Sequence, residues 1–418
     1  MKFSLSKPNL IKSQAVLALF LWSAPLGLMA QAVAPPTQQA TAPSNVVAPG
    51  VQYENFVVPA GPRNYNILRV NVADPRVTLE TESGQDRLFK GEKVLDSIRR
   101  ESRQNNEKIV AGINADFWNS KERLYTPVGM LVADGMIYSM PGKRGCFAFT
   151  ESEQSYIGRL TLTVTLSAGS ETLKVQEINP ARQNAAKVTL FTPPYGSQVA
   201  AGKDGKRFKL RMLEAEFLPN QPLRVEIEPL DISQAAALEA GSLILDVPND
   251  KVQNASVILS KGRKATLSAK IPQVKGVVKS VCGGGPILVR NGKADIREKE
   301  EGIGKGFVTA RHPRTAIGVS RDNKNVFLVT VDGRQPKISI GDNLYELADF
   351  MAKLGCWSAL NLDGGGSTTM VVDDKVVNHP SDVGGPRTVA ASILVVETNP
   401  AGKTPAAAPA PAQNGKSR

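Results

Sequence analysis

The sequence predicts an α+β fold with mixed, mostly antiparallel sheets, a few helices, a β-rich insertion in the middle and an active site on strand-end loops. Three observations predict it. Short apolar strands alternate with Gly-rich or polar turns along most of the 418 residues. Only residues 91–103 and 342–354 show clear helical spacing of apolar side chains. The connections are short, which favours antiparallel pairing over a doubly wound sheet.

The N-terminus resembles an export signal. Lysines precede an apolar stretch at residues 15–28, and Ala30-Gln31-Ala32 supplies the small-x-small pattern of a cleavage site. The stretch falls short of the ~20 apolar residues of a spanning helix. We therefore expect a signal peptide over residues 1–32 and an exported protein (periplasm, cell envelope or secreted), with an uncleaved anchor as the alternative. No later segment is apolar enough to cross a membrane.

The rest of the chain divides by composition. Residues 33–50 are rich in Pro, Ala, Gln and Thr, which predicts a disordered linker, and residues 399–418 form a similar Pro/Ala tail. Residues 51–398 are expected to form the folded domain. Within it, residues 151–275 contain short strands and polar turns with few concentrated reactive groups, and we expect a β-rich insertion or subdomain there.

The first half of the domain shows four recognisable elements. Residues 91–103 predict a short amphipathic helix, and residues 108–113 predict a strand that leads into the loop 114–119. Residues 127–138 read as a hairpin with Asp134-Gly135 as its turn. Residues 160–166 alternate strictly between apolar and polar side chains, as a strand with one solvated face does.

The second half carries the clearest helix. Leu344, Leu347 and Met351 share one face of a helix over 342–354, with Asp342 as the expected N-cap and Gly355 as its end. Apolar strands are expected on both sides of it; they cover residues 326–331, 357–362 and 370–372.

Charge and cysteine content exclude some functions and leave others open. The net charge is +12, but the two termini contribute half of it and the domain keeps +6 without a long basic run. We therefore expect no nucleic-acid partner. Cys146, Cys282 and Cys356 have no metal-ligand spacing, and which two of them would pair, if any, stays open.

The segment 361–369 (NLDGGGSTT) is the strongest chemical signal. A predicted strand ends in Asp363, three glycines follow, and then three hydroxyl side chains. Consecutive glycines expose backbone N–H groups that bind anions such as phosphate. The alternative is an ordinary Gly-rich turn.

Three further segments carry charged groups next to predicted strands. Residues 311–315 contain two arginines, which bind phosphate through paired N–H groups, although a solvated basic turn is the alternative. Asp332 follows an apolar strand, and Asp382 with Arg387 precedes the last strand. Together they predict a site rich in Arg, Asp and backbone amides.

These segments, in this order, resemble the phosphodiester glycosidase family from about residue 65 to 396. The matching stretches are GINADFW (112–118), PVGMLVADG (127–135), VCGGGPILVRNG (281–292), RHPRTAIGVS (311–320), VTVDGRQ (329–335), LYELADFMAKLG (344–355), NLDGGGSTTMVV (361–372) and VNHPSD with GGPRTVA (377–390). The family usually has GINGGFF where this chain has Asp116 and Trp118, which changes the expected pocket wall and leaves the substrate open.

The resemblance implies hydrolysis of the sugar–phosphate bond of a glycosyl-1-phosphodiester, of the GlcNAc-1-phosphodiester kind, to free sugar and a phosphomonoester. The partner would be a phosphorylated glycan, for example an exopolysaccharide. We assign Asp363 as the catalytic carboxylate, with Asp332 and Asp382 as further candidates. The expected substrate-binding residues are Asn114, Arg311, His312, Arg314, Thr315, Asn361, Gly364, Gly365, Gly366, Ser367, Thr368 and Arg387.

Two alternatives remain open at this stage. Asp332, Asp363 and Asp382 are hard oxygen ligands, so a Ca²⁺- or Mg²⁺-dependent phosphodiesterase that cleaves at phosphorus is one of them. The other is a non-catalytic envelope protein that binds phosphorylated glycans.

Overall fold

The computed structural model describes residues 45–59, 61–119 and 124–398. The predicted signal peptide and the C-terminal tail lie outside the described residues, as does the linker up to residue 44. Residues 45–48 of the predicted linker form a strand. None of the helices in the described part of the chain is both long and apolar enough to cross a membrane.

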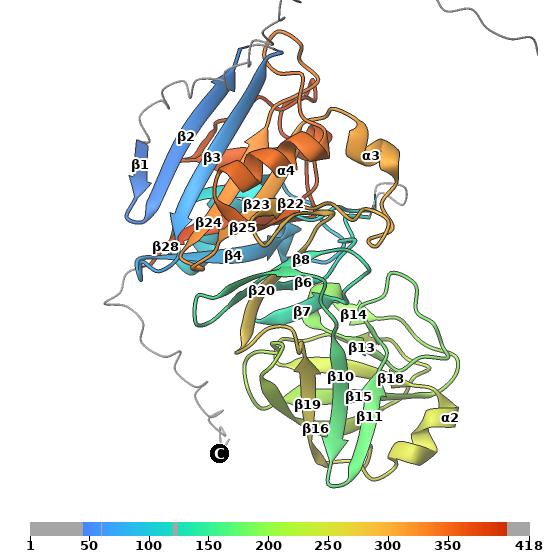
Figure 1. Ribbon diagram of the computed structural model, residues 1–418. Helices are drawn as coiled ribbons and strands as arrows, with labels where there is room; N and C mark the ends of the chain where they lie inside the picture. The colour runs from blue at the N-terminus through green and yellow to red at the C-terminus, as the bar shows by residue number, and fades with distance from the viewer. Residues whose placement is uncertain (1–44, 60, 120–123, 399–418) are drawn as a thin grey trace, which may run out of the picture. The chain divides into compact units, whose positions relative to one another are not determined.

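The protein is predominantly β, with fewer helices than the expected α+β mixture (Figure 1). One eight-stranded sheet is antiparallel throughout. Its strands, in spatial order, are β1 (Asn45–Ala48), β2 (Val51–Val58), β3 (Arg63–Asn71), β24 (Asn325–Val331), β23 (Arg314–Ser320), β25 (Cys356–Asn361), β21 (Ile287–Arg290) and β22 (Lys293–Ala294).

A second eight-stranded sheet is built wholly from residues 163–270, inside the predicted insertion. Its strands are β11 (Glu171–Val175), β10 (Thr163–Ala168), β19 (Lys264–Lys270), β16 (Pro222–Leu230), β15 (Lys206–Met212), β18 (Ser242–Val247), β13 (Thr189–Phe191) and β12 (Glu177–Ile178). The strand expected at residues 160–166 begins three residues later, as β10.

Two five-stranded sheets and a short pair complete the described part. One sheet holds β7 (Met136–Ser139), β6 (Leu131–Ala133), β20 (Val278–Gly283), β8 (Cys146–Thr150) and β9 (Ser155–Gly158). The other holds β27 (Lys375–Val376), β26 (Met370–Val372), β5 (Lys108–Asn114), β28 (Ala391–Glu397) and β4 (Val77–Ser83). The pair is β14 (Gln198–Val199) with β17 (Ala236–Ala237).

The helices are short. The α-helices are α1 (Val94–Asn105), α2 (Asn249–Val252), α3 (Lys305–Thr309) and α4 (Leu344–Lys353). Single 3₁₀ turns are η1 (Gly84–Asp86), η2 (Pro193–Tyr195), η3 (Gln253–Ala255) and η4 (Gly365–Ser367). The two predicted helices are therefore confirmed as α1 and α4, each with slightly shifted ends.

Helix α4 begins one residue later than the sequence suggested. Its N-cap is Asn343, whose side chain accepts from the backbone N–H of Tyr345 and Glu346, and Glu346 completes a capping box. Asp342 instead is fully buried and accepts a hydrogen bond from the hydroxyl of Tyr65 at 2.8 Å. The helix ends before Gly355, as predicted, where φ is +98°.

Successive side chains along the central strands of the first sheet point alternately into two different hydrophobic cores. Ile317 and Leu328 point to a core shared with the two five-stranded sheets, whereas their neighbours Ala316 and Val329 point to a core under α4. Both faces of the central strands are thus buried, and their side chains are apolar almost without interruption. Polar groups therefore gather where these strands end.

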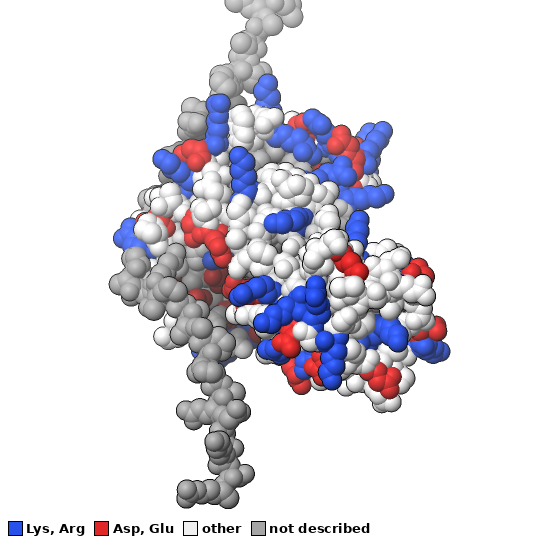
Figure 2. Space-filling view, turned by 90° about the horizontal axis from the view of Figure 1, so that it is seen from below, with Lys and Arg blue, Asp and Glu red and all other residues white. Residues whose placement is uncertain are grey.

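Basic and acidic side chains are interspersed on the protein surface. On the face shown in Figure 2, Lys and Arg side chains lie among Asp and Glu. The described cysteines are buried as free thiols: Cys146, Cys282 and Cys356.

Candidate active site

The candidate site lies at one edge of the first sheet. Strands β24 and β25 both end there, and β23, which lies between them and runs antiparallel to both, begins there. The turns that follow or precede these strands carry Asp332, the segment 311–315 and the glycine-rich loop after Asn361. Segments that are distant in the sequence therefore meet at this edge.

The glycine-rich loop packs against the backbone of the turn before β23. The N–H of Gly365 donates to the carbonyl oxygen of Pro313 at 2.9 Å, and a Cβ atom on Gly364 would lie 2.7 Å from that oxygen. Gly365 also has a φ of +64°, where a side chain is disfavoured. Close backbone packing thus requires these glycines, and the packing brings Asp363 next to residues 312–315.

Asn114 holds both ends of this loop. Its Nδ2 donates to the carbonyl oxygen of Asp363 at 2.7 Å, and its Oδ1 accepts from the N–H of Thr369 at 3.0 Å and from the hydroxyl of Thr315 at 2.9 Å. The side chain is fully buried at the end of β5. The Asn114 side chain therefore fixes the loop to β5 and β23.

The carboxylate of Asp363 has an unusual environment for an acidic group. Burial raises its pKa to about 6, although the hydroxyl of Ser367, the N–H of Gly364 and the positive charges of Arg387 and Arg144 favour the ionised form. The Gly364 N–H donates to its Oδ1 at 2.9 Å. The residue as a whole is partly exposed.

A second carboxyl group, Asp116, interacts electrostatically with Asp363. The pKa of Asp116 is raised to about 7, because burial and the charge of Asp363 raise it more than the Gly129 N–H and the charge of Arg144 lower it. Its Oδ2 accepts from the N–H of Gly129 at 2.7 Å, whereas its Oδ1 has no hydrogen-bond partner in the structure. The residue is only 1% exposed.

Two guanidinium groups lie over the glycines. Arg387 forms a bidentate ion pair with Asp382 at 2.8 and 3.1 Å, and this pair lies so close to Gly366 that a Cβ atom there would require the two side chains to shift. Arg334 lies against Gly365, where a Cβ atom would be 2.9 Å from its Nη2. Arg334 is exposed and has no carboxylate partner among the described residues.

Asp332 is fully buried, and both its oxygens are occupied. It accepts from Asn64 Nδ2 at 2.7 Å, Asn378 Nδ2 at 3.2 Å, the N–H of His379 at 2.8 Å and His379 Nδ1 at 2.9 Å. A carboxylate on Nδ1 fixes the imidazole tautomer and leaves Nε2 as the free nitrogen. The side chain of His379 is 53% exposed, so His379, rather than Asp332, is accessible to a ligand.

The sequence carries a signal for His379. It is one of two histidines in the chain, and only the short β26–β27 hairpin separates it from the glycine-rich loop. Asn378 connects His379 to that loop, because its Nδ2 also donates to the carbonyl oxygen of Thr368 at 3.1 Å. Arg334 and Arg144 are likewise outside the expected set of site residues, whereas Asp116 is expected only in the pocket wall.

Two of the arginines expected to bind phosphate, Arg314 and Arg311, make hydrogen bonds and an ion pair within the protein instead. Arg314 is buried and donates to the carbonyl oxygens of Asp342 at 3.1 Å, Phe307 at 3.0 Å and Ala310 at 2.6 Å, and burial lowers its pKa to about 10. It lies beside the loop, since its Cα is 3.6 Å from a Cβ on Gly364, yet its side chain anchors the α3 segment. Arg311 donates to Gly341 and pairs with Glu346.

The other expected residues lie near the loop in supporting positions. His312 is half-buried, its Nδ1 is 3.4 Å from Arg334 Nε, and its pKa is lowered by burial and by the charges of Arg314 and Arg334. The side chains of Thr315, Thr368 and Ser367 are buried. Asn361 Nδ2 donates to the carbonyl oxygen of Gly285 at 2.8 Å, and its Oδ1 has no hydrogen-bond partner in the structure.

The alternative metal site does not assemble from the three expected aspartates. Asp332 is occupied by four donors, and Asp382 pairs with Arg387. Within the described ranges, the group of three acidic side chains close enough to share an ion is a different one, Glu82, Glu101 and Asp134.

Sequence comparisons match the C-terminal part of the chain to a known family. Residues 225–396 match the family described as phosphodiester glycosidase. Over 104 residues the chain is 38% identical to the N-acetylglucosamine-1-phosphodiester alpha-N-acetylglucosaminidases of Bos taurus and Homo sapiens. This alignment covers 23% of the chain and 19% and 20% of those proteins, so the match spans about a fifth of their length.

Structural comparisons show the fold. A hypothetical protein from Synechocystis superposes with a TM-score of 0.63 and 22% identity, covering 87% of this chain and 64% of that one. A protein from Burkholderia pseudomallei K96243, described as exported, superposes with a TM-score of 0.57 and 24% identity, covering 80% and 74%. The architecture described above therefore also occurs in solved structures.

Proposed function

Since residues 225–396 match the phosphodiester glycosidase family, we propose that this chain hydrolyses the sugar–phosphate bond of a glycosyl-1-phosphodiester. Water adds to the anomeric carbon, the bond between that carbon and the phosphate oxygen breaks, and a free sugar and a phosphomonoester leave. GlcNAc is the sugar we expect, because the enzymes that share 38% identity with this chain are named for it.

The environment of Asp363 carries this proposal. A carboxylate on a partly exposed residue, with two guanidinium groups over the adjacent glycines, fits a substrate that develops positive charge on its sugar and carries negative charge on its phosphate. We assign Asp363 to act at the anomeric carbon. The phosphate would lie on Arg334 and Arg387.

The remaining expected acids take indirect roles in this scheme. Asp382 holds the guanidinium of Arg387, and Asp332 holds the imidazole of His379. His379 Nε2 would accept the proton of the attacking water as the general base. A phosphomonoester is a good leaving group, so the charge on its oxygens needs stabilisation more than a proton.

Export is part of the proposal. The N-terminal signal pattern supports it, and so does the description of the Burkholderia protein as exported. A phosphorylated envelope glycan or exopolysaccharide is then the substrate class we expect.

The test is hydrolysis of an α-GlcNAc-1-phosphodiester, followed by the release of reducing sugar. We expect Asp363→Asn to lower kcat about 10²-fold or more with an unchanged circular dichroism spectrum. A variant that retains kcat within a few-fold contradicts the role of Asp363. In ¹⁸O-water the label should enter the sugar; label in the phosphate would identify cleavage at phosphorus, and absence of turnover on any sugar-1-phosphodiester would favour a binding protein.

A further inference from the structure

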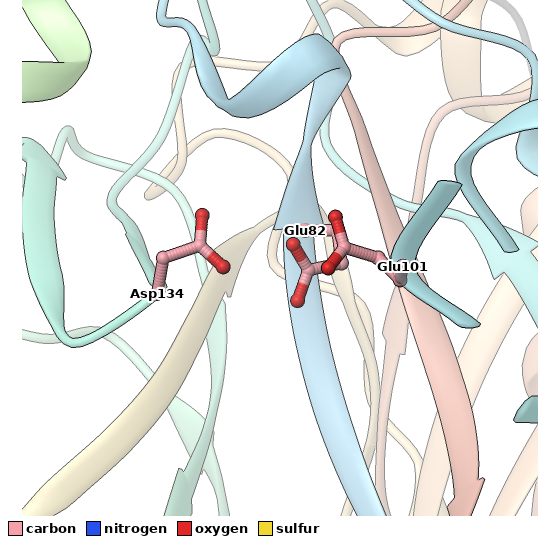
Figure 3. Close-up of side chains that lie close together, drawn as sticks. All are labelled: Glu82, Glu101 and Asp134. Atoms are coloured by element: carbon pink, nitrogen blue, oxygen red, sulfur yellow. The ribbon is translucent and has the colours of Figure 1, made fainter. Parts of the chain in front are cut away.

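Three carboxylates from separate elements converge outside the candidate active site. Glu82 lies on β4, Glu101 lies on α1 and Asp134 lies in the turn between β6 and β7. One oxygen of each lies within 4.8 Å of the other two. Figure 3 shows the three side chains pointing toward one another.

Glu82 points to a missing partner in this cluster. Its side chain and that of Glu101 are each only 4% exposed, and Glu82 Oε2 has no hydrogen-bond partner in the structure. An ionised carboxylate is costly to bury unless an opposite charge or a proton compensates it. The cluster therefore requires either a cation or a shared proton.

The nearby protein cations are already engaged. The Arg100 guanidinium contacts Glu101, Asp86 and Glu92, so three carboxylates share its single charge. The Lys279 Nζ lies 3.3 Å from Glu80 and 3.2 Å from the Thr78 hydroxyl.

Negative charge therefore remains in excess around Glu82. The excess charge agrees with a missing cation.

The oxygen atoms of the cluster retain capacity for a ligand. Glu101 Oε2 accepts from Asn105 at 3.0 Å, and Asp134 Oδ2 accepts from the Tyr138 hydroxyl at 2.6 Å. An ionised carboxylate offers about four lone-pair positions, so each of these groups has others free. A cavity of about 300 Å³ adjoins the cluster and admits water; Glu80, Glu107, Glu151 and Glu216 also line it.

We propose that Glu82, Glu101 and Asp134 bind a Ca²⁺ ion. The donors are all oxygens, which suits Ca²⁺ or Mg²⁺ better than zinc or copper. Ca²⁺ accepts six to eight oxygens in irregular arrangements, so water from the cavity completes its shell, whereas Mg²⁺ demands a near-ideal octahedron. Carboxylates from a strand, a helix and a hairpin turn match the more tolerant ion.

The ion would join three elements that are separate in sequence. It would fix α1 and β4 to the hairpin of β6 and β7. That hairpin begins just after Gly129, whose N–H holds the buried carboxyl of Asp116. We therefore assign the site a stabilising role that does not depend on the proposed hydrolysis.

The test measures binding and unfolding of the full chain, without an activity assay. After treatment with EDTA, we expect CaCl₂ to raise the Tm by several degrees and isothermal titration calorimetry to show one saturable site. Glu82→Gln should abolish both effects. Glu216 lines the same cavity outside the cluster, so the control variant Glu216→Gln should bind Ca²⁺ as the wild type does.

A second variant keeps the test decisive. Asp134 lies on an exposed turn, so Asp134→Asn should fold even if Glu82→Gln does not, and it should lose Ca²⁺ binding as well. No Ca²⁺-dependent change in Tm and no saturable binding would identify a shared proton instead and overturn the proposal. Equal or tighter binding of Mg²⁺ would overturn the choice of Ca²⁺.

Discussion

The amide nitrogen of the Asn114 side chain donates a hydrogen bond of 2.7 Å to the backbone carbonyl oxygen of Asp363. This contact joins the end of β5 to the loop after β25, two segments that are 249 residues apart in the sequence. The position of the Asp363 carboxylate thus depends on a residue of another sheet.

Asn114→Ala should lower kcat by about tenfold or more and leave KM nearly unchanged, because it lets the Asp363 carboxylate move while the exposed guanidinium groups stay in place. Steady-state kinetics on a glycosyl-1-phosphodiester measures this split. The control is Thr315→Val, which removes a hydrogen bond to Asn114 Oδ1 but keeps the contact with Asp363. An Asn114→Ala variant that changes only KM would contradict the positioning role.

Asp116 should make the protein less stable as the pH rises from about 4 to 7. In the unfolded chain this carboxyl loses its proton near pH 4, whereas in the folded protein burial raises its pKa to about 7. Between these values the folded state holds the additional proton, so the free energy of unfolding falls with rising pH and becomes constant above 7.

Asp116→Asn should flatten this pH dependence. The asparagine oxygen still accepts from Gly129, and the side chain has nearly the same volume. Urea unfolding of both proteins at pH 4, 5.5 and 7 measures the difference, and parallel curves for the two would contradict the assignment.

Asp332 and His379 should behave as one unit. Asp332→Asn removes the acceptor that holds His379 Nδ1, so we expect kcat to fall about 10²-fold, as it should in His379→Gln. The double variant should be no slower than His379→Gln alone. Additive losses in this double-mutant cycle would mean that the two residues act independently.

Arg334 and Arg314 should respond to substitution in opposite ways. Arg334 is exposed, so Arg334→Ala should leave the Tm unchanged and raise KM about tenfold or more through the loss of a charge-assisted hydrogen bond to phosphate. Arg314→Ala removes the donor of three backbone carbonyls and should lower the free energy of unfolding by about 3 kcal/mol.

Thermal unfolding and KM, measured on both variants, separate the two roles. Lys337→Ala removes another exposed cation of the same turn and serves as the control. A large loss of stability in Arg334→Ala, or none in Arg314→Ala, would reverse the assignment.

Local patterns predicted the elements that carry strong periodicity. The turn at Asp134-Gly135 is confirmed, and both residues have positive φ, as a two-residue hairpin loop requires. Helix α4 is confirmed as well, although its N-cap is Asn343 because Asp342 is buried against Tyr65. The contact between Asp342 and Tyr65 leaves Asn343 as the N-cap. The sequence of the helix alone does not reveal this contact, because Tyr65 lies far away in the chain.

The site was less predictable for the same reason. Arg314 and Arg334 are both arginines near strand ends. Arg314 donates hydrogen bonds to carbonyl oxygens of the α3 segment, whereas Arg334 lies over a glycine. Asp332 is a candidate acid in the sequence because its hydrogen-bond partners, Asn64 and His379, come from distant segments that local patterns do not connect to it. Residue types indicate which segments carry polar groups, whereas the contacts of each side chain depend on the three-dimensional packing.

The tight packing around Asp116 limits how this protein can be re-engineered. Gly129 and Gly283 approach so closely that a Cβ atom on either would lie 2.6 Å from the Cα of the other. A mutant library should therefore keep both glycines fixed. Diversity belongs on the aromatic residues nearby, of which Phe117 and Trp118 are half-buried and Phe307 is exposed.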